Sequence, residues 1–163
     1  MNRVHVPHSL QHPTLLPMRE WEIGENEGQD VDSEMLFYNG KTPSDPWPWE
    51  TPFEKLPTVF EAFRSEQFIL KEALSARSVD KGKLIRAYRQ LWIAIFWLNE
   101  EPVTFHNWEE KVTGFVIKPL NAKERLQFCA LRPQHVHAFA QATQLMKELE
   151  KIMYRTKTMN NRK

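Results

Sequence analysis

The amino-acid sequence predicts an all-α protein: a compact bundle of four or five helices preceded by an irregular, acidic segment that contains prolines and tryptophans. Two observations carry this prediction. Beyond residue 57, apolar residues recur at helical spacing, and only three prolines and two glycines interrupt them. Within that part, the eight residues from Leu91 to Leu98 are all apolar, so a helix formed there has no polar face and must be surrounded by other elements.

The chain divides into two halves of opposite charge. Residues 1–57 hold eight of the eleven prolines and carry a net charge of −6, whereas residues 58–163 carry +7, so the whole chain is at +1. This balance indicates no strong overall attraction to nucleic acid or to an anionic membrane. We therefore predict three parts: an irregular or partly disordered segment (1–50), a helical domain (51–156) and a basic, frayed tail (157–163).

An acidic stretch and a proline–tryptophan strip make up much of the N-terminal segment. Seven carboxylates and no basic residue lie between Glu20 and Glu34, which disfavours independent folding because little apolar surface offsets the entropy of ordering. Trp47 and Trp49 stand among prolines that favour an extended or turning path. Such a strip is a possible ligand for an aromatic groove, but we expect the tryptophans to pack on the protein's own surface.

Three long helices are predicted in the second half. Thr51-Pro52-Phe53-Glu54 has the form of a helix start, but Pro57 limits that turn, so we expect the first long helix to begin near residue 57 or 58. The second, over about 80–99, follows a cap signal in Ser78-Val79-Asp80. It contains the apolar tract and is expected at the centre of the bundle. The third, over about 134–155, has a buried stripe at a spacing near 3.5 residues.

The connecting segments carry weaker signals. Residues 102–120 show no helical period and contain short β-prone runs, which predicts a small hairpin or a packed loop. Asn121-Ala122-Lys123-Glu124 has the pattern of a capping box, so a shorter helix is expected to start there. Pro133 biases the residue before it away from the α region, which predicts that this helix breaks or restarts at that point.

The histidines are poorly arranged for a metal site. His5, His8 and His12 have helical spacing, but Pro7 and Pro13 disfavour a helix there. No histidine pair stands in a recognisable ligand motif with a carboxylate. We therefore predict no metal site.

Nucleophilic and cofactor chemistry have little support either. The one cysteine, Cys129, lies on a predicted helix between apolar neighbours, which is typical of a buried thiol. A single cysteine excludes an internal disulfide framework. Five glycines, never closer than four apart, do not form a phosphate-binding loop. We predict no catalytic residue and no cofactor.

Several short motifs in the second half occur together. They are Leu91-Trp92-Ile93-Ala94-Ile95 ending in Asn99-Glu100, Pro102-Val103, Lys118-Pro119-Leu120-Asn121 with Glu124-Arg125-Leu126, and Arg132-Pro133 with His135-Val136-His137-Ala138-Phe139. This combination, over about sixty residues, resembles the YpoC-like family of bacterial proteins. The resemblance implies a small cytosolic protein of low-GC Gram-positive bacteria, in a family without an established activity. It also implies a gene near those of DNA replication and repair, and it supplies no catalytic residues.

The leading functional hypothesis is a non-enzymatic protein-interaction module with an unidentified protein partner. The apolar stripe of the last helix also allows self-association. The first alternative is an accessory protein that touches nucleic acid through Lys83, Arg86 and Arg89, which recur every three residues on one helix side. Interspersed acidic residues and the lack of a DNA-binding signature favour an ordinary solvated face instead.

The second alternative is an enzyme with a site in the region of residues 102–135. The candidate residues for binding a partner or an anion there are His106, Asn107, Trp108, Asn121, Arg125, Arg132 and His135. We favour a structural role for Arg125 and Arg132, which would hold the loop of residues 106–108 by bonding its carbonyls and an acidic side chain such as Glu100.

Location follows from two further features. The longest apolar run has eight residues, whereas about 20 are needed to cross a bilayer, so no membrane association is expected. Residues 1–7 lack the apolar core of an export signal, and together with the single cysteine this predicts a cytoplasmic protein.

Overall fold

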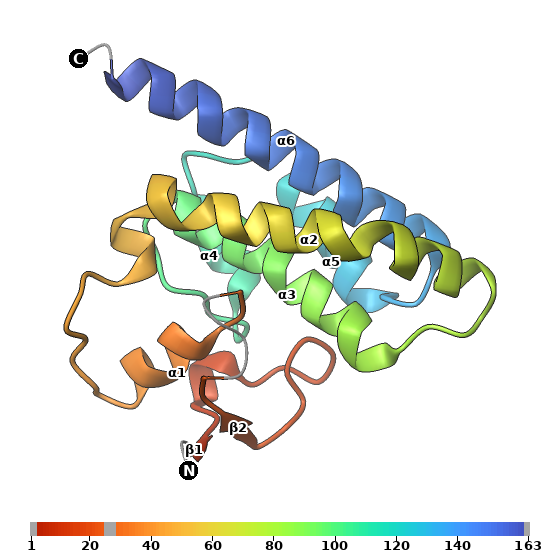
Figure 1. The fold of residues 1–163 in the computed structure, drawn as a ribbon, viewed down its shortest axis with the longest axis horizontal. Coiled ribbons are helices and arrows are strands. Elements are labelled where there is room, and N and C mark those ends of the chain that lie inside the picture. Colours follow the sequence, from red (N-terminus) through yellow and green to blue (C-terminus); the bar gives the residue numbers. More distant parts are fainter. Residues whose placement is uncertain (1–2, 25–28, 162–163) are drawn as a thin grey trace.

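The fold is known from a computed structural model, which describes residues 3–24 and 29–161. These ranges contain six α-helices and one two-stranded antiparallel sheet (Figure 1). In chain order the elements are β1 (Arg3–His5), the 3₁₀ helix η1 (His8–Leu10), β2 (Glu20–Glu22), α1 (Asp32–Tyr38), the 3₁₀ helix η2 (Pro48–Glu50), α2 (Pro52–Ser75), α3 (Lys81–Leu98), α4 (Trp108–Gly114), α5 (Ala122–Leu131) and α6 (Val136–Asn161). The all-α prediction is confirmed, with one helix more than expected.

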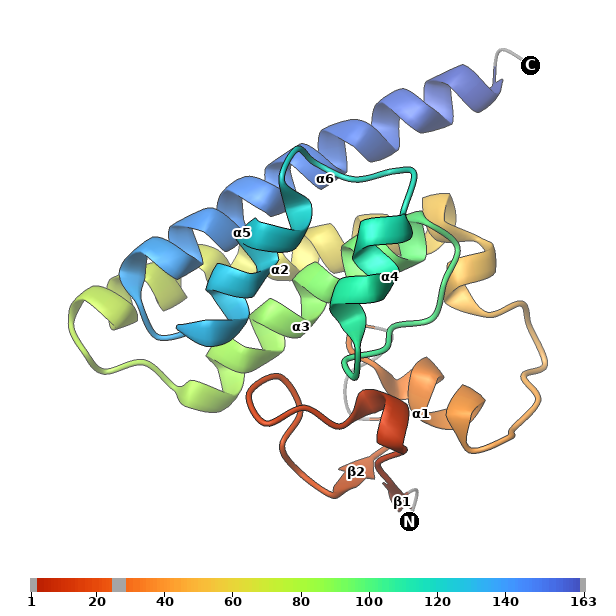
Figure 2. The ribbon, with the colours of Figure 1, turned by 180° about the vertical axis from the view of Figure 1, so that it is seen from behind.

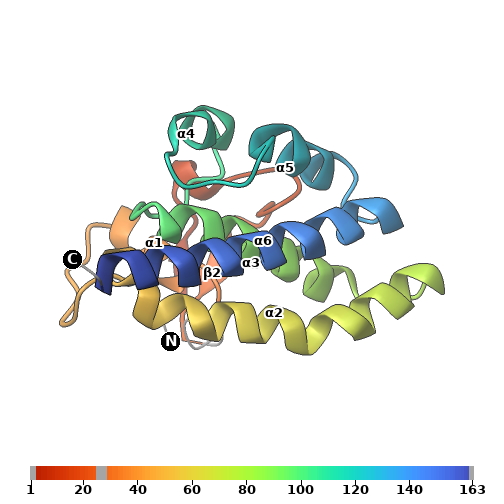
Figure 3. The same ribbon diagram turned by 90° about the horizontal axis from the view of Figure 1, so that it is seen from above.

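Helix α3 is the centre of the molecule. Figure 3 shows it between α2 on one side and α4 and α5 on the other, while Figure 1 shows α6 above it and the N-terminal segment below. Every residue from Leu91 to Leu98 is buried. The predicted central position of the apolar tract is therefore confirmed, and four different parts of the chain supply its cover.

Aromatic side chains connect α3 to the segment that follows it. The rings of Trp92 and Trp108 meet edge to face with centroids 5.1 Å apart, and Phe96 and Phe115 do the same at 5.0 Å. Trp108 and Val112, four residues apart, are both buried, as one face of a helix requires. The prediction of a hairpin or loop over 102–120 is thus wrong for α4, whose single buried face is too short to produce a visible helical period.

Helix α2 begins earlier than predicted and contains Pro57. The proline ring removes one backbone donor, so the turn loses the hydrogen bond to the Phe53 carbonyl. Leu56, Val59 and Phe60 around that position are buried against the rest of the molecule. Burial of apolar side chains on both sides of the proline stabilises the helix across it. The sequence prediction considered only the local effect of the proline and therefore placed the helix start too late.

The predicted starts of α3 and α5 and the predicted break at Pro133 can be compared with the structure. Asp80 caps α3 as predicted, because its side chain accepts a hydrogen bond of 3.1 Å from the Lys83 amide. Helix α5 begins after Asn121 as expected, but Asn121 is left-handed (φ 56°) and makes no side-chain cap, so the capping box is wrong. Helix α5 ends at Leu131 and α6 begins at Val136, so the interruption expected at Pro133 is confirmed.

The last helix is longer than predicted. Helix α6 continues to Asn161, so residues 157–161, expected to fray, are helical, while residues 162–163 lie outside the described residues. No proline or glycine follows Pro133, so nothing in the local sequence stops the helix. Its C-terminal end projects beyond the other elements (Figure 1).

The N-terminal segment has more regular structure than predicted and packs on the bundle. Its apolar residues join the main core, and those buried most completely are Leu10, Leu15, Leu16, Val31 and Met35. The rings of Trp47 and Trp49 stack on each other 5.1 Å apart, and Trp49 is buried, which confirms that the strip packs on the protein itself. Part of the predicted loose acidic stretch, residues 25–28, lies outside the described residues.

Among the described residues, no helix is both long enough and apolar enough to cross a bilayer.

Two buried tryptophans of α3 allow a direct test of what a hydrogen bond adds in this core. The indole N–H of Trp97 donates to Glu34, whereas that of Trp92 has no partner among the described residues. We expect Trp97→Phe to lower the free energy of unfolding by about 1–3 kcal/mol more than Trp92→Phe, because only the former takes a hydrogen-bond donor away from a buried carboxylate. Urea denaturation measures both, and equal losses would contradict the assigned role of the bond.

Candidate functional site

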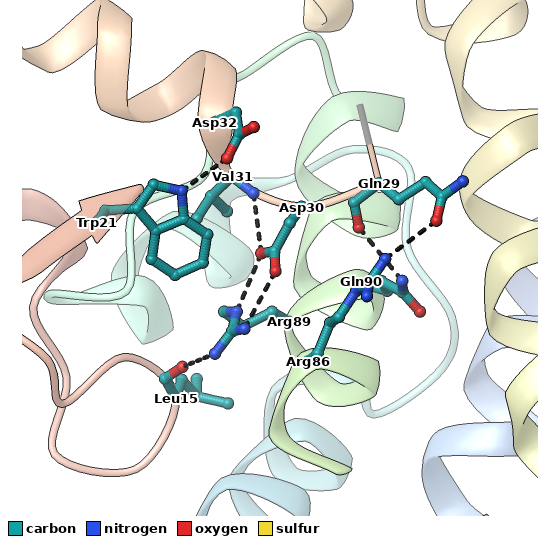
Figure 4. A network of polar contacts seen from close by, with 9 residues as sticks. All are labelled: Leu15, Trp21, Gln29, Asp30, Val31, Asp32, Arg86, Arg89 and Gln90. Carbon is teal, nitrogen blue, oxygen red and sulfur yellow. Dashed lines mark hydrogen bonds and ion pairs between the residues drawn. The ribbon is translucent and has the colours of Figure 1, made fainter. Parts of the chain in front are cut away.

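A buried ion pair joins the N-terminal segment to the central helix. The Arg89 side chain of α3 donates to both Asp30 carboxylate oxygens, at 3.0 and 3.1 Å, and to the Leu15 carbonyl at 3.0 Å (Figure 4). Arg89 is only 6% exposed and Asp30 only 1%. The Trp21 ring lies 5.2 Å from the guanidinium carbon and covers its face. One side chain of α3 therefore holds two separate stretches of the N-terminal segment.

The predicted basic face for nucleic acid does not exist as an exposed surface. Arg89 is buried in the ion pair, and Arg86 is half-buried and donates to the Gln29 side chain at 3.1 Å. Only Lys83 of the three is exposed. The prediction is wrong for Arg89 because the acidic N-terminal segment, which sequence spacing does not place, lies against this side of α3.

A histidine organises the loop that Arg89 contacts. The Nδ1 atom of His12 accepts hydrogen bonds from the backbone amides of Thr14 and Leu15, at 3.1 and 3.0 Å. Burial lowers the pKa of His12, against an opposing effect of Glu109. The neutral ring is the form that can accept both bonds, so the fold keeps His12 in the state that orders residues 12–16.

A cavity of about 620 Å³ opens beside the ion pair, where three segments meet. These are the loop of residues 13–18, the start of α3, and the turn between α5 and α6, which Figure 2 shows close together. The apolar part of its wall comes from Pro13, Pro17, Met18, Ile85 and Pro133. The Tyr88 hydroxyl donates to the Pro133 carbonyl at 2.6 Å and fixes the turn that forms one side.

The charged groups of this cavity have one sign. Lys81 and Arg89 line it, and no carboxylate does. Arg89 uses three of its five N–H groups on Asp30 and Leu15, and the described residues supply no acceptor for the other two. The cavity thus combines an apolar wall with cationic groups, which is the usual composition of a site for a small anionic ligand.

A second buried carboxylate lies deeper in the core. Glu34 of α1 accepts hydrogen bonds from the Trp97 indole at 2.6 Å and from the Val103 amide at 2.9 Å, both on Oε2, while Oε1 has no partner among the described residues. Burial raises the pKa of Glu34 to about 7, and the nearby Asp30 charge adds to the rise. The side chain joins α1, α3 and the segment after α3 at one point.

The predicted cluster around residue 106 is not assembled as a site. His106 is exposed, with its ring centroid 4.2 Å from that of His8. Asn107 has a left-handed backbone (φ 56°) and precedes α4. Trp108 is 2% exposed and packs on Trp92, so it is a core residue and cannot contact a ligand at the surface.

Arg125 connects the start of α5 to α6, with other partners than the sequence predicts. It donates to the Leu120 carbonyl at 3.0 Å and to Glu148 of α6 at 2.9 Å. Arg125 thus bonds a backbone carbonyl and an acidic side chain, but the acid is Glu148 and not Glu100, and the Leu120 carbonyl lies outside the loop of residues 106–108. The Arg125 guanidinium lowers the pKa of Glu148, as expected of an ion pair.

The remaining candidates lie apart from these contacts. Asn121 is exposed at the start of α5, and Arg132 and His135 are exposed in the turn between α5 and α6. The Nδ1 atom of His135 accepts from the His137 amide at 3.2 Å, a contact within the turn itself. The cavity beside Arg89 is not lined by Arg125, Arg132 or His135, so the sequence candidates and the structural site differ.

Metal and thiol chemistry find no support among the described residues. Within residues 3–24 and 29–161, no three His, Cys, Asp or Glu side chains are grouped to hold a metal ion. Cys129 is buried, its thiol donates to the Ala138 carbonyl at 3.4 Å, and burial raises its pKa to about 12. A thiol in this state is a poor nucleophile at neutral pH.

A second concave surface lies between the antiparallel helices α2 and α6. It is a groove of about 310 Å³. Its principal lining residues are Phe68, Lys71 and Leu74 from α2 and Val136, Phe139 and Lys147 from α6. Phe68 is 70% exposed and Val136 41%, whereas Leu74 and Phe139 are buried beneath them. The groove thus combines buried apolar residues with two exposed lysines.

Comparison with known proteins identifies the family. The model of the YpoC-like protein family matches residues 53–161. The chain belongs to the YpoC-like family. It is also 28% identical over 116 residues to the uncharacterized protein YpoC of Bacillus subtilis (strain 168), in an alignment that covers 69% of this chain and 71% of that protein. No solved structure matches the chain.

The matched region contains only part of the site. Arg89, the α2–α6 groove and Glu148 lie inside residues 53–161. Asp30, Leu15 and the 13–18 wall of the cavity precede it. The groove is thus built wholly from the part that defines the family, whereas the cavity also needs the preceding segment.

The buried ion pair predicts an asymmetric response to mutation. We expect Asp30→Ala to lower the free energy of unfolding by about 3–5 kcal/mol, because it leaves the Arg89 charge buried and unpaired. The double variant Asp30→Ala/Arg89→Met should lose less than the sum of the single variants. The matched control is Arg64→Met at the exposed Arg64–Glu150 pair, with an expected loss of about 0–1 kcal/mol. Equal losses in urea denaturation for the buried and exposed pairs would contradict this assignment.

Glu34 predicts a pH dependence of stability with a defined sign. Its folded-state pKa of about 7 lies above the ordinary value of 4.5, so the folded protein holds the proton more tightly than the unfolded chain. The stabilisation is complete below pH 4.5 and is lost as the pH rises through 7. We expect Glu34→Gln to gain up to about 3 kcal/mol relative to wild type between pH 5 and 8.

Denaturation at several pH values measures this difference. Glu124→Gln, at an exposed position of α5, is the control and should keep the wild-type profile. A Glu34→Gln profile parallel to that of wild type would refute the role assigned to Glu34.

Proposed function

We propose that the protein is a non-enzymatic interaction module whose α2–α6 groove binds one helix of a partner protein. The observation that carries the proposal is Phe68, which is 70% exposed above a floor of buried apolar residues. Exposed large apolar side chains beside a groove are typical of protein-binding surfaces. A groove between two antiparallel helices suits a third helix that inserts apolar side chains at positions i, i+3 or i+4, and i+7.

The charge of the groove specifies the partner further. Lys71 of α2 and Lys147 of α6 lie among its lining residues, and no carboxylate lines it. A helix with glutamates or aspartates on both sides of its apolar stripe would have carboxylates available for the lysine of each helix. The proposed partner is therefore an acidic, amphipathic helix.

The other two functional hypotheses gain less from the geometry. The nucleic-acid hypothesis rested on three basic residues, of which Arg86 and Arg89 are engaged with the chain itself. The enzyme hypothesis required polar groups that converge in a pocket near residues 102–135. Neither the cavity beside Arg89 nor the α2–α6 groove is lined by His106, Arg125 or Arg132.

Two synthetic helical peptides test the proposal. Both carry the same apolar stripe, one with flanking glutamates and one with flanking lysines. In fluorescence anisotropy we expect the glutamate peptide to bind more tightly than the lysine peptide, and its affinity to fall as the salt concentration rises. Phe68→Asp should lower the affinity for the glutamate peptide by at least about tenfold, the equivalent of about 1.4 kcal/mol at an interface hot spot.

Ile69→Asp supplies the matched control, because Ile69 is 62% exposed beside Phe68 but does not line the groove. It should leave the affinity for the glutamate peptide unchanged. Equal binding of the two peptides, or equal effects of the two substitutions, would contradict the proposal. So would a dimer in light scattering that Phe68→Asp dissociates, because the occupant would then be a second copy of the chain.

A further inference from the structure

We propose that the cavity beside Arg89 is a binding site for a small organic anion, with an apolar body and one acidic group such as a carboxylate, phosphate or sulfonate. This site is separate from the α2–α6 groove and does not depend on the function proposed for it. The cavity volume of about 620 Å³ lies within the range of sites that hold small ligands, about 300–1,000 Å³.

The wall chemistry specifies the body of the ligand. Pro13, Pro17 and Met18 line the cavity from the N-terminal loop, and Ile85 and Pro133 line it from the bundle. Met18 is 39% exposed although it is a large apolar residue, so a ligand that covers it would remove apolar surface from water. Burial of such surface is favourable by about 25 cal/mol per Å², which favours an aromatic or aliphatic body over a bare inorganic ion.

The charged groups specify the acidic end. Lys81, at the first position of α3, lines the cavity and is exposed, so its ammonium group is free to contact a ligand. The Arg89 side chain, 7% exposed, lies at the inner wall. Two of its N–H groups have no acceptor among the described residues. Asp30 neutralises the Arg89 charge, so Lys81 supplies the main attraction for the acidic group.

The position of the cavity adds a consequence for the fold. One wall belongs to the loop that His12 orders, and the opposite wall belongs to the turn that Tyr88 holds through the Pro133 carbonyl. A ligand in the cavity would contact both the N-terminal segment and the bundle. Because it would bind only when these parts are together, it should raise the stability of the folded state in proportion to its occupancy.

A pair of fluorescent probes separates the two parts of the proposal. The first is 1-anilinonaphthalene-8-sulfonate, and the second is N-phenyl-1-naphthylamine, which has the same ring system without the sulfonate. The titrations are carried out on the full chain with the Phe68→Asp substitution, so that the α2–α6 groove contributes little to the signal. We expect the sulfonate to bind at one site, more tightly than the neutral probe, and to raise the melting temperature.

Two substitutions with matched controls then test the wall. Lys81→Gln should weaken sulfonate binding about fivefold, as loss of one exposed charge contact does, and should change the affinity of the neutral probe little. Lys83→Gln removes the same charge from the same turn of α3 outside this cavity, and both affinities should stay unchanged. Met18→Ala should weaken both probes, whereas Met159→Ala, on the exposed end of α6, should weaken neither.

The outcomes decide between three readings. If sulfonate binding depends on both Lys81 and Met18, the result supports the site. If probe binding depends on Met18 alone and the two probes bind equally well, the anionic part of the proposal is overturned and an apolar pocket remains. If probe binding depends on neither residue, the site itself is overturned. Circular dichroism of each variant confirms that the fold is kept, so a loss of binding reports on the cavity.

Discussion

The central constraint on this molecule is that the second half of α3 has no polar face. A helix that is apolar on every side is stable in water only if other elements cover it completely. Helices α2, α4, α5 and α6 cover three sides, and the N-terminal segment covers the fourth (Figures 1 and 3). The positions of the other elements follow from this requirement.

The packing of the N-terminal segment on α3 explains the buried polar contacts. The N-terminal segment is acidic and rich in proline, so its docking brings carboxylates into the core. A buried carboxylate is tolerated only with donors close by. Arg89 supplies them for Asp30, and the Trp97 indole with the Val103 amide supplies them for Glu34. Glu34, with one oxygen unpaired among the described residues, is the less completely satisfied of the two.

The two concave surfaces lie between different parts of the chain. One lies at the border between the 13–18 loop and the bundle, and the other lies between α2 and α6. They differ in their relation to the family, because the matched region contains the whole groove but only part of the cavity wall. All the residues that line the groove lie within the part of the chain that matches the YpoC-like family.

By itself, the sequence determined the helical class, the central place of residues 91–98, the cap at Asp80 and the interruption at Pro133, because periodicity, capping and proline geometry act over a few residues. It did not determine the passage of α2 through Pro57, the helix at 108–114, or the burial of Arg89. Those features depend on which distant segment lies opposite. An arginine has the same local sequence signal on a solvated face as in a buried ion pair, and only the tertiary contact with Asp30 decides between them.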